Sequence, residues 1–245
     1  MTPEQTSPWG SGFAAAVSLT YDDGISNHLD IAIPMLEEYG FRGTFYLITS
    51  SGHMRERKDD WRRAFERGHE IGNHSVRHPG WDIKNAAPDA PRLERMSPAE
   101  IEAEVGDAAA WLDRHIGPDP RRTYAYPYAH NFIGPDKQVA PYEAAVRRYC
   151  AGSRLGGTGV PNPPGTNPYA LRGFGFGANS TAEQLIGYCE QALQSGGLTI
   201  LDFHGIGGPW IETAGEVHRR LLDYLAAHPI RVAPLRDLLA PSPAN

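Results

Sequence analysis

Segments typical of strands and segments typical of helices alternate along this chain. Apolar stretches rich in β-branched and aromatic residues alternate with stretches of helical spacing, which favours a parallel sheet joined by crossover helices. Two of the helices open on capping boxes, Ser97 with Glu100 and Ser180 with Glu183. We expect strands at 14–20, 43–48, 69–73, 123–126, 198–204 and 230–233, and helices at 27–39, 59–67, 98–116, 141–148, 181–194 and 215–227.

The length of 245 residues suits a single α/β domain. We expect this domain to span residues 14–240, between an N-terminal tail (1–13) and a C-terminal tail (241–245). Two long segments, 79–96 and 154–179, are rich in Pro, Gly and Asn, which favours loops. Loops of this length in a compact domain are usually functional, so we expect both to form walls of a site, the alternative being exposed excursions of the surface.

Composition argues against several classes of partner. The net charge of −6 is unlike that of a surface for nucleic acid or anionic membranes, and no apolar run is long enough to span a bilayer. The first residues lack a basic segment followed by an apolar one. The sequence as given therefore predicts a cytoplasmic protein, or an exported one if its start has been trimmed. Cys150 and Cys189 lack the spacing of metal ligands and are expected to be buried thiols.

Acidic and imidazole side chains follow two of the expected strands. The strand at 14–20 leads into Asp22 and Asp23, and adjacent carboxylates at the rim of an apolar core are costly unless a cation neutralises them. His74 and His78 follow the strand at 69–73, and at this spacing they would share one face of a helical turn. Two histidines and one aspartate leave coordination positions open, so this set predicts a catalytic metal site.

The strand at 198–204 carries two more polar side chains. Because side chains alternate along a strand, Asp202 and His204 point to the same face. A buried face with an acid and an imidazole needs a polar interior. Such an interior is expected at the carboxyl ends of strands in α/β folds, where ligands gather.

Together these motifs resemble those of the polysaccharide deacetylases, the NodB-type domain of carbohydrate esterase family four. The resemblance rests on Thr20-Tyr21-Asp22-Asp23-Gly24 and His74-Ser75-Val76-Arg77-His78, and it extends over residues 14–239. Tyr124-Ala125-Tyr126-Pro127-Tyr128 is similar to the family's third motif, and the Leu-rich strand that ends in His204-Gly205 is similar to its last. The resemblance implies the following roles: Asp22 as general base, Asp23, His74 and His78 as metal ligands, the backbone N–H of Tyr128 as oxyanion donor, and His204 as general acid.

The chain departs from the family pattern at two places. The family's third motif has an arginine that orients the catalytic aspartate, and this chain has Ala125 there; we expect Arg154, at the carboxyl end of a strand, to replace it. The acid that usually steadies the catalytic histidine is also missing, since no aspartate lies between Asp136 and Asp202. We expect Asp202 to orient His204 instead.

Aromatic residues follow three of the motifs, namely Trp81, Tyr128 and Trp210. Aromatic faces near a hydrolytic centre commonly stack on sugar rings, and packing that anchors the loops is the alternative. We assign Trp81 and Trp210 to substrate binding.

The resemblance implies a distorted (β/α) barrel with seven or eight parallel strands. It also implies a metal-dependent hydrolase of carbohydrate metabolism that removes acetyl groups from a sugar or oligosaccharide, N-acetyl in preference to O-acetyl. Zinc is the expected metal, with cobalt, nickel or manganese as alternatives. An acetylated sugar or oligosaccharide is the expected partner, and neither nucleic acid nor membrane is expected.

Three alternatives remain open. A related amidohydrolase would act on a cyclic amide or imide, which the altered third and fourth motifs permit. A non-haem iron oxygenase also uses two histidines and a carboxylate, but typically on antiparallel double-sheet folds. A carbohydrate-binding protein without catalysis would need neither Asp22 nor His204, and the chain has both.

Overall fold

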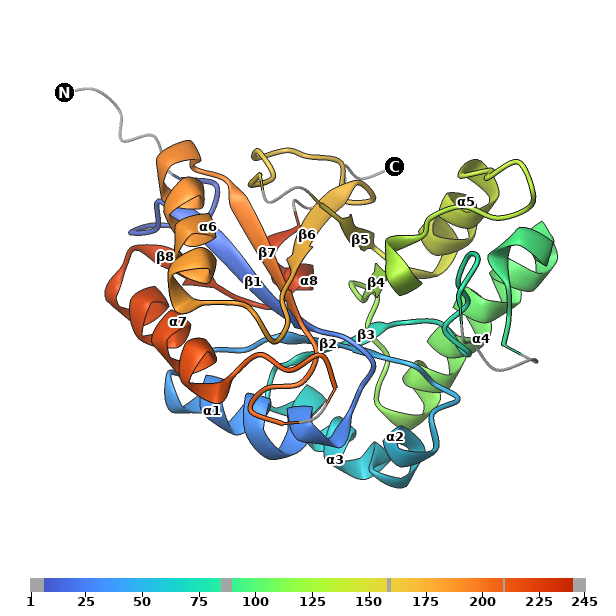
Figure 1. The fold of residues 1–245 in the computed structure, drawn as a ribbon, viewed down its shortest axis with the longest axis horizontal. Coiled ribbons are helices and arrows are strands. Elements are labelled where there is room, and N and C mark those ends of the chain that lie inside the picture. Colours follow the sequence, from blue (N-terminus) through green and yellow to red (C-terminus); the bar gives the residue numbers. More distant parts are fainter. Residues whose placement is uncertain (1–6, 85–89, 158–159, 209, 240–245) are drawn as a thin grey trace.

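Parallel strands form a closed barrel at the centre of the molecule (Figure 1). The computed structural model describes residues 7–84, 90–157, 160–208 and 210–239. In this part of the chain, β1 to β7 close into the barrel because β1 pairs with both β2 and β7, and β8 adds to the start of β1. The strands are β1 (Ala15–Tyr21), β2 (Thr44–Leu47), β3 (Glu70–Asn73), β4 (Thr123–Ala125), β5 (Gly152–Gly156), β6 (Leu171–Gly175), β7 (Leu198–Phe203) and β8 (Ile230–Val232).

The barrel is distorted at β1. One edge of β1 pairs with β7, and the other edge is divided between β8 and β2. Its first residues pair with β8, and only Thr20 and Tyr21 at its end pair with β2. The seam between β1 and β2 is therefore short. The expectation of a distorted (β/α) barrel with seven or eight parallel strands is confirmed.

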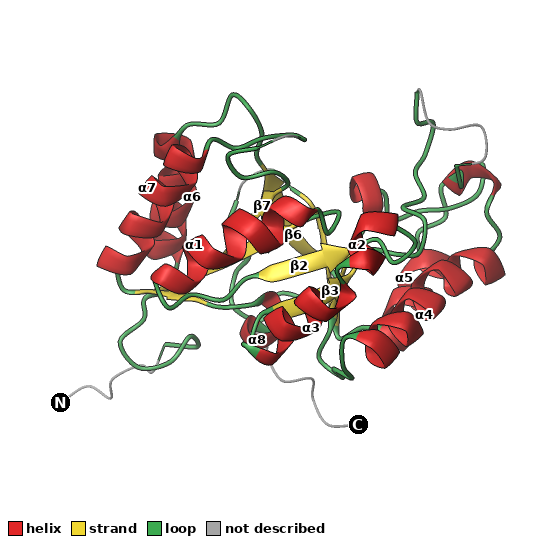
Figure 2. Cartoon of the chain, turned by 90° about the horizontal axis from the view of Figure 1, so that it is seen from below, coloured by secondary structure: helices red, strands yellow, loops and turns green. Residues whose placement is uncertain are grey.

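Helices pack around the outside of the barrel (Figures 1 and 2). α6 and α7 contact each other, with α1 beside α7 through an ion pair between Glu38 and Arg219, and α4 and α5 pack together on the opposite flank. None of the helices in the described residues is long and apolar enough to cross a membrane. The helices are α1 (Ile33–Glu38), α2 (Gly52–Glu56), α3 (Lys58–Glu66), α4 (Pro98–His115), α5 (Ala140–Tyr149), α6 (Ala182–Ser195), α7 (Gly215–Ala227) and α8 (Leu235–Leu238).

The sequence of β1 sets the two faces of the barrel wall. Leu19 and Tyr21 belong to the apolar core between the barrel and its helices. Ser18 and Thr20 alternate with them and are fully buried on the opposite face, inside the barrel. Asp22 is the next residue of this inner series. The alternation thus carries a carboxylate to the mouth of the barrel.

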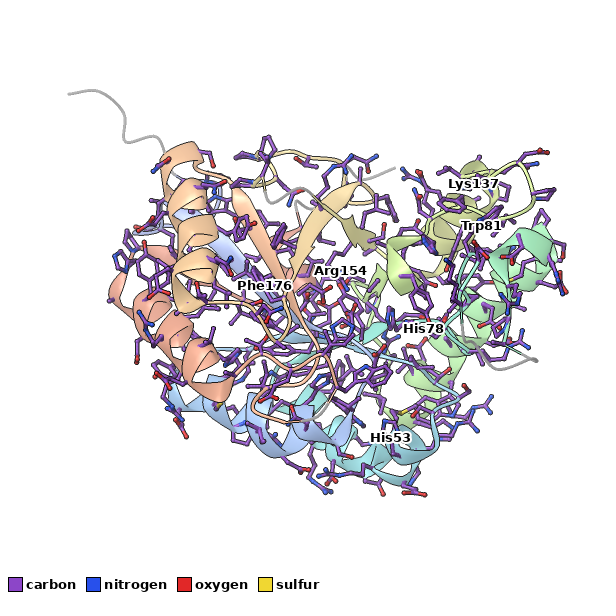
Figure 3. The ribbon with its side chains drawn as sticks, in the orientation of Figure 1. His53, His78, Trp81, Lys137, Arg154 and Phe176 are labelled. Carbon is purple, nitrogen blue, oxygen red and sulfur yellow. The ribbon has the colours of Figure 1, made fainter. Side chains whose placement is uncertain are left out.

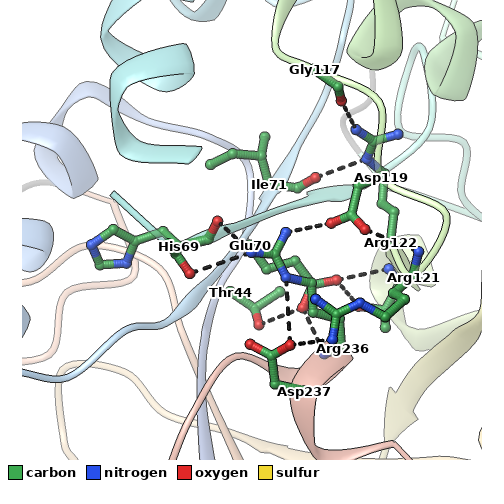
Figure 4. Close-up of polar contacts among 12 residues, drawn as sticks. Thr44, His69, Glu70, Ile71, Gly117, Asp119, Arg121, Arg122, Arg236 and Asp237 are labelled. Atoms are coloured by element: carbon green, nitrogen blue, oxygen red, sulfur yellow. Dashed lines mark hydrogen bonds and ion pairs between the residues drawn. The ribbon is translucent and has the colours of Figure 1, made fainter. Parts of the chain in front are cut away.

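A polar cluster surrounds Glu70 at the start of β3 (Figure 4). Glu70 of β3 is fully buried and accepts hydrogen bonds from the Thr123 hydroxyl at 2.7 Å and the backbone N–H of Arg236 at 2.9 Å. Burial raises the pKa of Glu70. The Tyr46 hydroxyl lies 2.7 Å from that of Thr123, and the guanidinium of Arg154 lies 5.4 Å from the centre of the Tyr46 ring. The polar interior of the barrel therefore extends from Glu70 toward the carboxyl ends of the strands.

β6 lies inside segment 154–179, which the sequence predicts as a loop, and β5 runs into that segment. Both strands are rich in glycine, which weakens a strand pattern in the sequence. Packing requires one of these glycines, because a Cβ at Gly173 would lie only 2.6 Å from Cδ of Arg154. Gly173 therefore makes room for a large side chain inside the barrel.

The two predicted capping boxes have different outcomes. Ser97 and Glu100 cap α4 as expected. The cap of α6 lies one residue later than predicted, with Thr181 as the N-cap residue and Gln184 as its partner. Ser180 instead accepts a hydrogen bond from the N–H of Gly177 at 2.9 Å.

Candidate metal centre and catalytic cleft

A cleft of about 570 Å³ opens at the carboxyl ends of the strands. Segment 154–179 contributes to its wall as predicted. The described residues of segment 79–96 do not line the cleft, and residues 85–89 of that segment lie outside the described residues. The lining residues are Asp22, Asp23, Ile48, His74, His78, Tyr126, Tyr128, Ala129, Arg154, Gly156, Gly157, Gly173, Phe174, Gly175, Asp202, His204, Trp210 and Ile211.

Asp23, His74 and His78 form a cluster in this cleft. Their ligand atoms all lie within 4.8 Å of one another. Nε2 of His74 is 3.1 Å from Nε2 of His78, and Oδ1 of Asp23 is 3.6 Å from each of these nitrogens. Two imidazole nitrogens on one tetrahedral zinc, with bonds of about 2.0–2.1 Å, would be roughly 3.3 Å apart. The spacing therefore fits a single divalent ion.

Left-handed backbone brings the two histidines together, and the helical turn expected between them is absent. The segment from His74 to His78 contains no helix, and φ is 67° at Ser75 and 57° at His78. Nδ1 of His74 lies 2.8 Å from the carbonyl oxygen of Ala125. A proton on Nδ1 for this hydrogen bond leaves Nε2 free to coordinate a metal.

The hydrogen bonding of Asp23 and the protonation of His78 also suit a metal site. Oδ1 of Asp23 is buried and has no hydrogen-bond partner among the described residues. Burial, together with the neighbouring His74, lowers the pKa of His78 to about 3, so this imidazole is neutral near pH 7. A carboxylate oxygen without a partner and two imidazole nitrogens form a donor set for zinc and similar ions.

Arg154 joins Asp22 to Asp202 inside the barrel. Nη2 of Arg154 donates to Oδ2 of Asp22, and Nη1 donates to Oδ2 of Asp202 at 2.9 Å. Burial alone would raise the pKa of Asp22, but Arg154, His74 and His204 together outweigh it and hold this pKa well below its usual range. Burial raises the pKa of Asp202 to about 7 despite the same arginine. Asp22 is therefore the ionised member of the pair near neutral pH.

Figure 3 shows Arg154 in the middle of the molecule, which corrects its expected position. The residue lies within β5 and not at the carboxyl end of a strand. Its long side chain reaches the mouth of the barrel past Gly173. The contact with Asp22 is the one that the sequence led us to expect.

His204 lies beside Asp23, with its Nε2 3.9 Å from Oδ2 of the carboxylate. Asp202 makes no hydrogen bond to His204, because its Oδ2 accepts from Arg154. Oδ1 of Asp202 and Nδ1 of His204 have no partner among the described residues. The expectation that Asp202 orients His204 directly is therefore wrong. The backbone of His204 is held by His28, whose Nε2 lies 2.8 Å from its carbonyl oxygen and whose pKa burial lowers to about 4.

Trp81 does not line the cleft, which corrects its assignment to substrate binding. Its ring packs edge-on against Phe132 with 5.2 Å between ring centroids, and Nζ of Lys137 lies 5.0 Å from its centre (Figure 3). Its backbone N–H donates to Nδ1 of His130 at 3.1 Å. These contacts anchor a loop, the alternative that the sequence left open.

Tyr128 and Trp210 line the cleft and are largely exposed. The Tyr128 ring contacts that of His78, with 4.5 Å between centroids. In the turn around Tyr128, the N–H of Ala129 donates to the carbonyl of Tyr126 at 2.9 Å. The indole N–H of Trp210 donates to Oδ2 of Asp23 at 3.0 Å, a contact with no signal in the sequence.

Unusual backbone conformations concentrate around the cleft. Among the described residues, nine that are not glycine have positive φ, and six of these nine line the cleft. Such conformations persist where the surroundings enforce them, and they cluster at functional sites. The six are Asp23, His78, Tyr128, Ala129, Trp210 and Ile211.

Comparison with known proteins agrees with this site. The sequence pattern of the family described as polysaccharide deacetylase matches residues 12–139, which is more than half of the chain. The chain belongs to the polysaccharide deacetylase family. The matched residues include all four side chains of the first two motifs, Asp22, Asp23, His74 and His78.

Two proteins are similar in sequence to parts of this chain. The chain is 30% identical over 155 residues to a gellan lyase of a Bacillus species, covering 63% of this chain and 5% of that protein. It is 32% identical over 101 residues to a chitooligosaccharide deacetylase of Rhizobium leguminosarum bv. trifolii, covering 41% of this chain and 44% of that protein. The chain thus spans less than half the length of these relatives.

A solved structure of similar fold is a family 4 acetyl xylan esterase from Clostridium thermocellum in complex with a cobalt ion. The two structures have a TM-score of 0.57 and 22% sequence identity, over 91% of this chain and 89% of that one. At this identity the likeness concerns the fold, which is the polysaccharide deacetylase barrel described above.

Proposed function

We propose that this member of the polysaccharide deacetylase family is a metal-dependent hydrolase that removes acetyl groups from a carbohydrate, N-acetyl in preference to O-acetyl. The observation that carries the proposal is the position of Asp22, held ionised by Arg154 beside the Asp23–His74–His78 cluster. The names of a relative, a chitooligosaccharide deacetylase, and of a protein of similar fold, an acetyl xylan esterase, support an acetylated sugar as substrate.

Asp23, His74 and His78 would hold the metal ion. Zinc is our first choice, and cobalt, nickel or manganese also suit two nitrogens and one oxygen with open positions. When bound, such an ion supplies Lewis-acid activation of water and of the acetyl carbonyl. Because burial lowers the pKa of His78 to about 3, this imidazole is already neutral near pH 7 and need not lose a proton to coordinate the ion.

Asp22 acts as the general base in this proposal. Arg154 occupies Oδ2 of its carboxylate, while Oδ1 is buried and has no partner among the described residues. Oδ1 is therefore free to take a proton from the attacking water. The low pKa of Asp22 keeps it ionised over the whole physiological range.

His204 and Tyr128 act on the other parts of the reacting group. The N–H of Tyr128 donates to the oxygen on which negative charge develops. His204 protonates the departing group, and this matters most for an amide, because an amine is a poor leaving group until it is protonated. The presence of an imidazole at this position is why we favour N-acetyl over O-acetyl substrates.

The test is acetate release from a panel of acetylated sugars by the protein stripped of metal and then supplied with each candidate ion. We expect release from N-acetylated oligosaccharides to exceed that from O-acetylated ones and to depend on the added ion. Cyclic amides and imides serve as a second panel. Hydrolysis of these compounds without acetate release, or sugar binding without any hydrolysis, would contradict the proposal.

A further inference from the structure

The two oxygens of the Asp23 carboxylate have different surroundings. Oδ1 faces Nε2 of His74 and of His78, at 3.6 Å from each. Oδ2 turns away from them and accepts the indole N–H of Trp210 at 3.0 Å. The torsion that rotates a carboxylate about its last bond has a broad preference, so Asp23 by itself would not keep one oxygen toward the histidines. A donor on Oδ2 fixes this rotation.

Apolar packing does not account for the position of Trp210. The residue is 62% exposed, so most of its ring faces solvent. Its indole N–H nevertheless points inward to the carboxylate. A tryptophan buries its ring and leaves its polar edge toward water when packing decides its position. The reverse arrangement indicates that the hydrogen bond sets the position of this side chain.

The loop that carries Trp210 is built to hold it there. Trp210 and Ile211 are consecutive residues with left-handed backbone, at φ of 79° and 45°. The carbonyl of Trp210 accepts from the N–H of Gly205 at 3.0 Å, and Gly205 in turn accepts from Thr213 at 2.8 Å. These bonds fix both ends of the loop, so the strained backbone is enforced by its surroundings.

A second contact ties the same loop to the segment that follows Asp23. The side chain of Asn27 accepts from the N–H of Ile206 at 2.7 Å and donates to the Ile206 carbonyl at 3.0 Å. Asn27 is four residues from Asp23, so the donor and the acceptor of the indole hydrogen bond belong to segments that are fastened to each other.

We propose that Trp210 is a positioning residue for the metal site, in which its indole N–H holds Oδ2 of Asp23 so that Oδ1 remains directed at the ion shared with His74 and His78. This inference rests on the metal site of the proposed function. Partners of this kind orient a ligand, and their removal typically lowers metal affinity by about 10- to 100-fold.

The test is the affinity of the stripped protein for Zn²⁺ and Co²⁺, measured in competition with a chromogenic chelator. Trp210→Phe keeps an aromatic ring but lacks the donor, and Trp210→Ala lacks both. We expect the two variants to bind each ion about 10- to 100-fold more weakly than the wild type and nearly equally to each other. Trp81→Phe is the matched control, because Trp81 lies outside the cleft, and it should bind like the wild type.

Wild-type affinity in Trp210→Phe would overturn the inference, as would a loss confined to Trp210→Ala, which would assign the effect to the ring. Failure of the wild type itself to bind either ion would contradict the proposed function instead. A second measurement needs no variant: the indole N–H resonance of Trp210 should exchange with water more slowly than that of an exposed indole, before and after Zn²⁺ is added. Exchange as fast as in a free indole would also overturn the inference.

Discussion

The carboxyl groups of Asp22 and Asp202 both contact the guanidinium of Arg154, but they differ in protonation state. The Arg154 contact, with the nearby imidazoles, keeps Asp22 ionised, whereas burial raises the pKa of Asp202 to about 7. Two buried carboxylates beside one cation do not both ionise easily. The guanidinium of Arg154 thus holds the base Asp22 in place. The same guanidinium is itself held by Asp202, which carries a proton near neutral pH.

We expect Asp22→Asn to keep its metal and lose most of its activity. The amide cannot accept the proton of water, and such a general base typically contributes about 10²- to 10⁴-fold in rate. Elemental analysis and turnover on the best acetylated substrate check this, with Asp136→Asn in an exposed loop as the control. Near-normal turnover of Asp22→Asn would mean that the base is another residue.

We expect Arg154→Ala to lower kcat on the order of 10²-fold, because Asp22 loses the group that orients it. Added guanidinium should restore part of the loss, since it can occupy the space beside both carboxylates. Lysine should not substitute well, because an ammonium lacks the planar fork that bridges two acids. Kinetics with and without guanidinium are compared with those of the exposed Arg121→Ala. A folded Arg154→Ala protein with wild-type kcat would contradict this role.

The elements of the fold differ in how far their sequences reveal them. β1 and β7 have clear patterns because each is apolar and ends in polar residues that the site uses. β6 is hard to predict because its glycines weaken the strand pattern, and the need for Gly173 becomes visible only when β5 pairs with β6 and brings Arg154 beside it. The cap of α6 was placed one residue early because Ser180-Glu183 and Thr181-Gln184 are overlapping boxes of similar chemistry.

The position of the α6 cap at Thr181 leads to a testable prediction about stability. Thr181→Ala should lower the free energy of unfolding by about 1 kcal/mol, because the N–H of Gln184 loses its acceptor. Glu183→Gln should change it little, since the ion pair of Glu183 with Arg220 is exposed and a glutamine keeps an acceptor oxygen. Urea unfolding of both variants decides between the two registers. A larger loss in Glu183→Gln than in Thr181→Ala would favour the cap that the sequence predicted.

The molecule as a whole assembles its site from segments that are far apart in the chain. The motifs with Asp22, Asp23, His74 and His78 could be predicted because each lies next to a strand end and has recognisable chemistry. The contacts of Arg154 with Asp202 and of Trp210 with Asp23 could not, because they join β5 to β7 and the loop after β7 to the first motif, and these segments meet only in the assembled barrel. Pairing across the closed barrel is set by tertiary packing, which a local pattern does not contain.

The packing of helices on the barrel also buries a histidine, His218 of α7, and this predicts acid lability. Burial lowers the pKa of His218, whose Nε2 lies 2.8 Å from the Tyr21 hydroxyl, to about 3. Since the unfolded chain takes up a proton below about pH 6.5 and the native state does not, stability is full above that pH and is lost as the pH falls toward 3. Relative to the wild type, His218→Gln should therefore become more stable between pH 7 and pH 4.

Urea unfolding of the stripped proteins at both pH values measures this difference, which a single group limits to a few kcal/mol. His53→Gln, at an exposed position, is the control for a histidine that lies outside the core. A difference between wild type and His218→Gln that stays constant with pH would show that His218 is not held neutral in the fold.

The central claim is that Asp23, His74 and His78 bind one catalytic ion. The most direct measurement is a titration of stripped protein with Zn²⁺ in which bound metal and acetate release are followed together. The account predicts that both rise in parallel and level off at about one ion per chain, and that the variant with alanine at all three positions shows neither. Metal occupancy retained by that triple variant, or activity that is unchanged after stripping, would contradict the account.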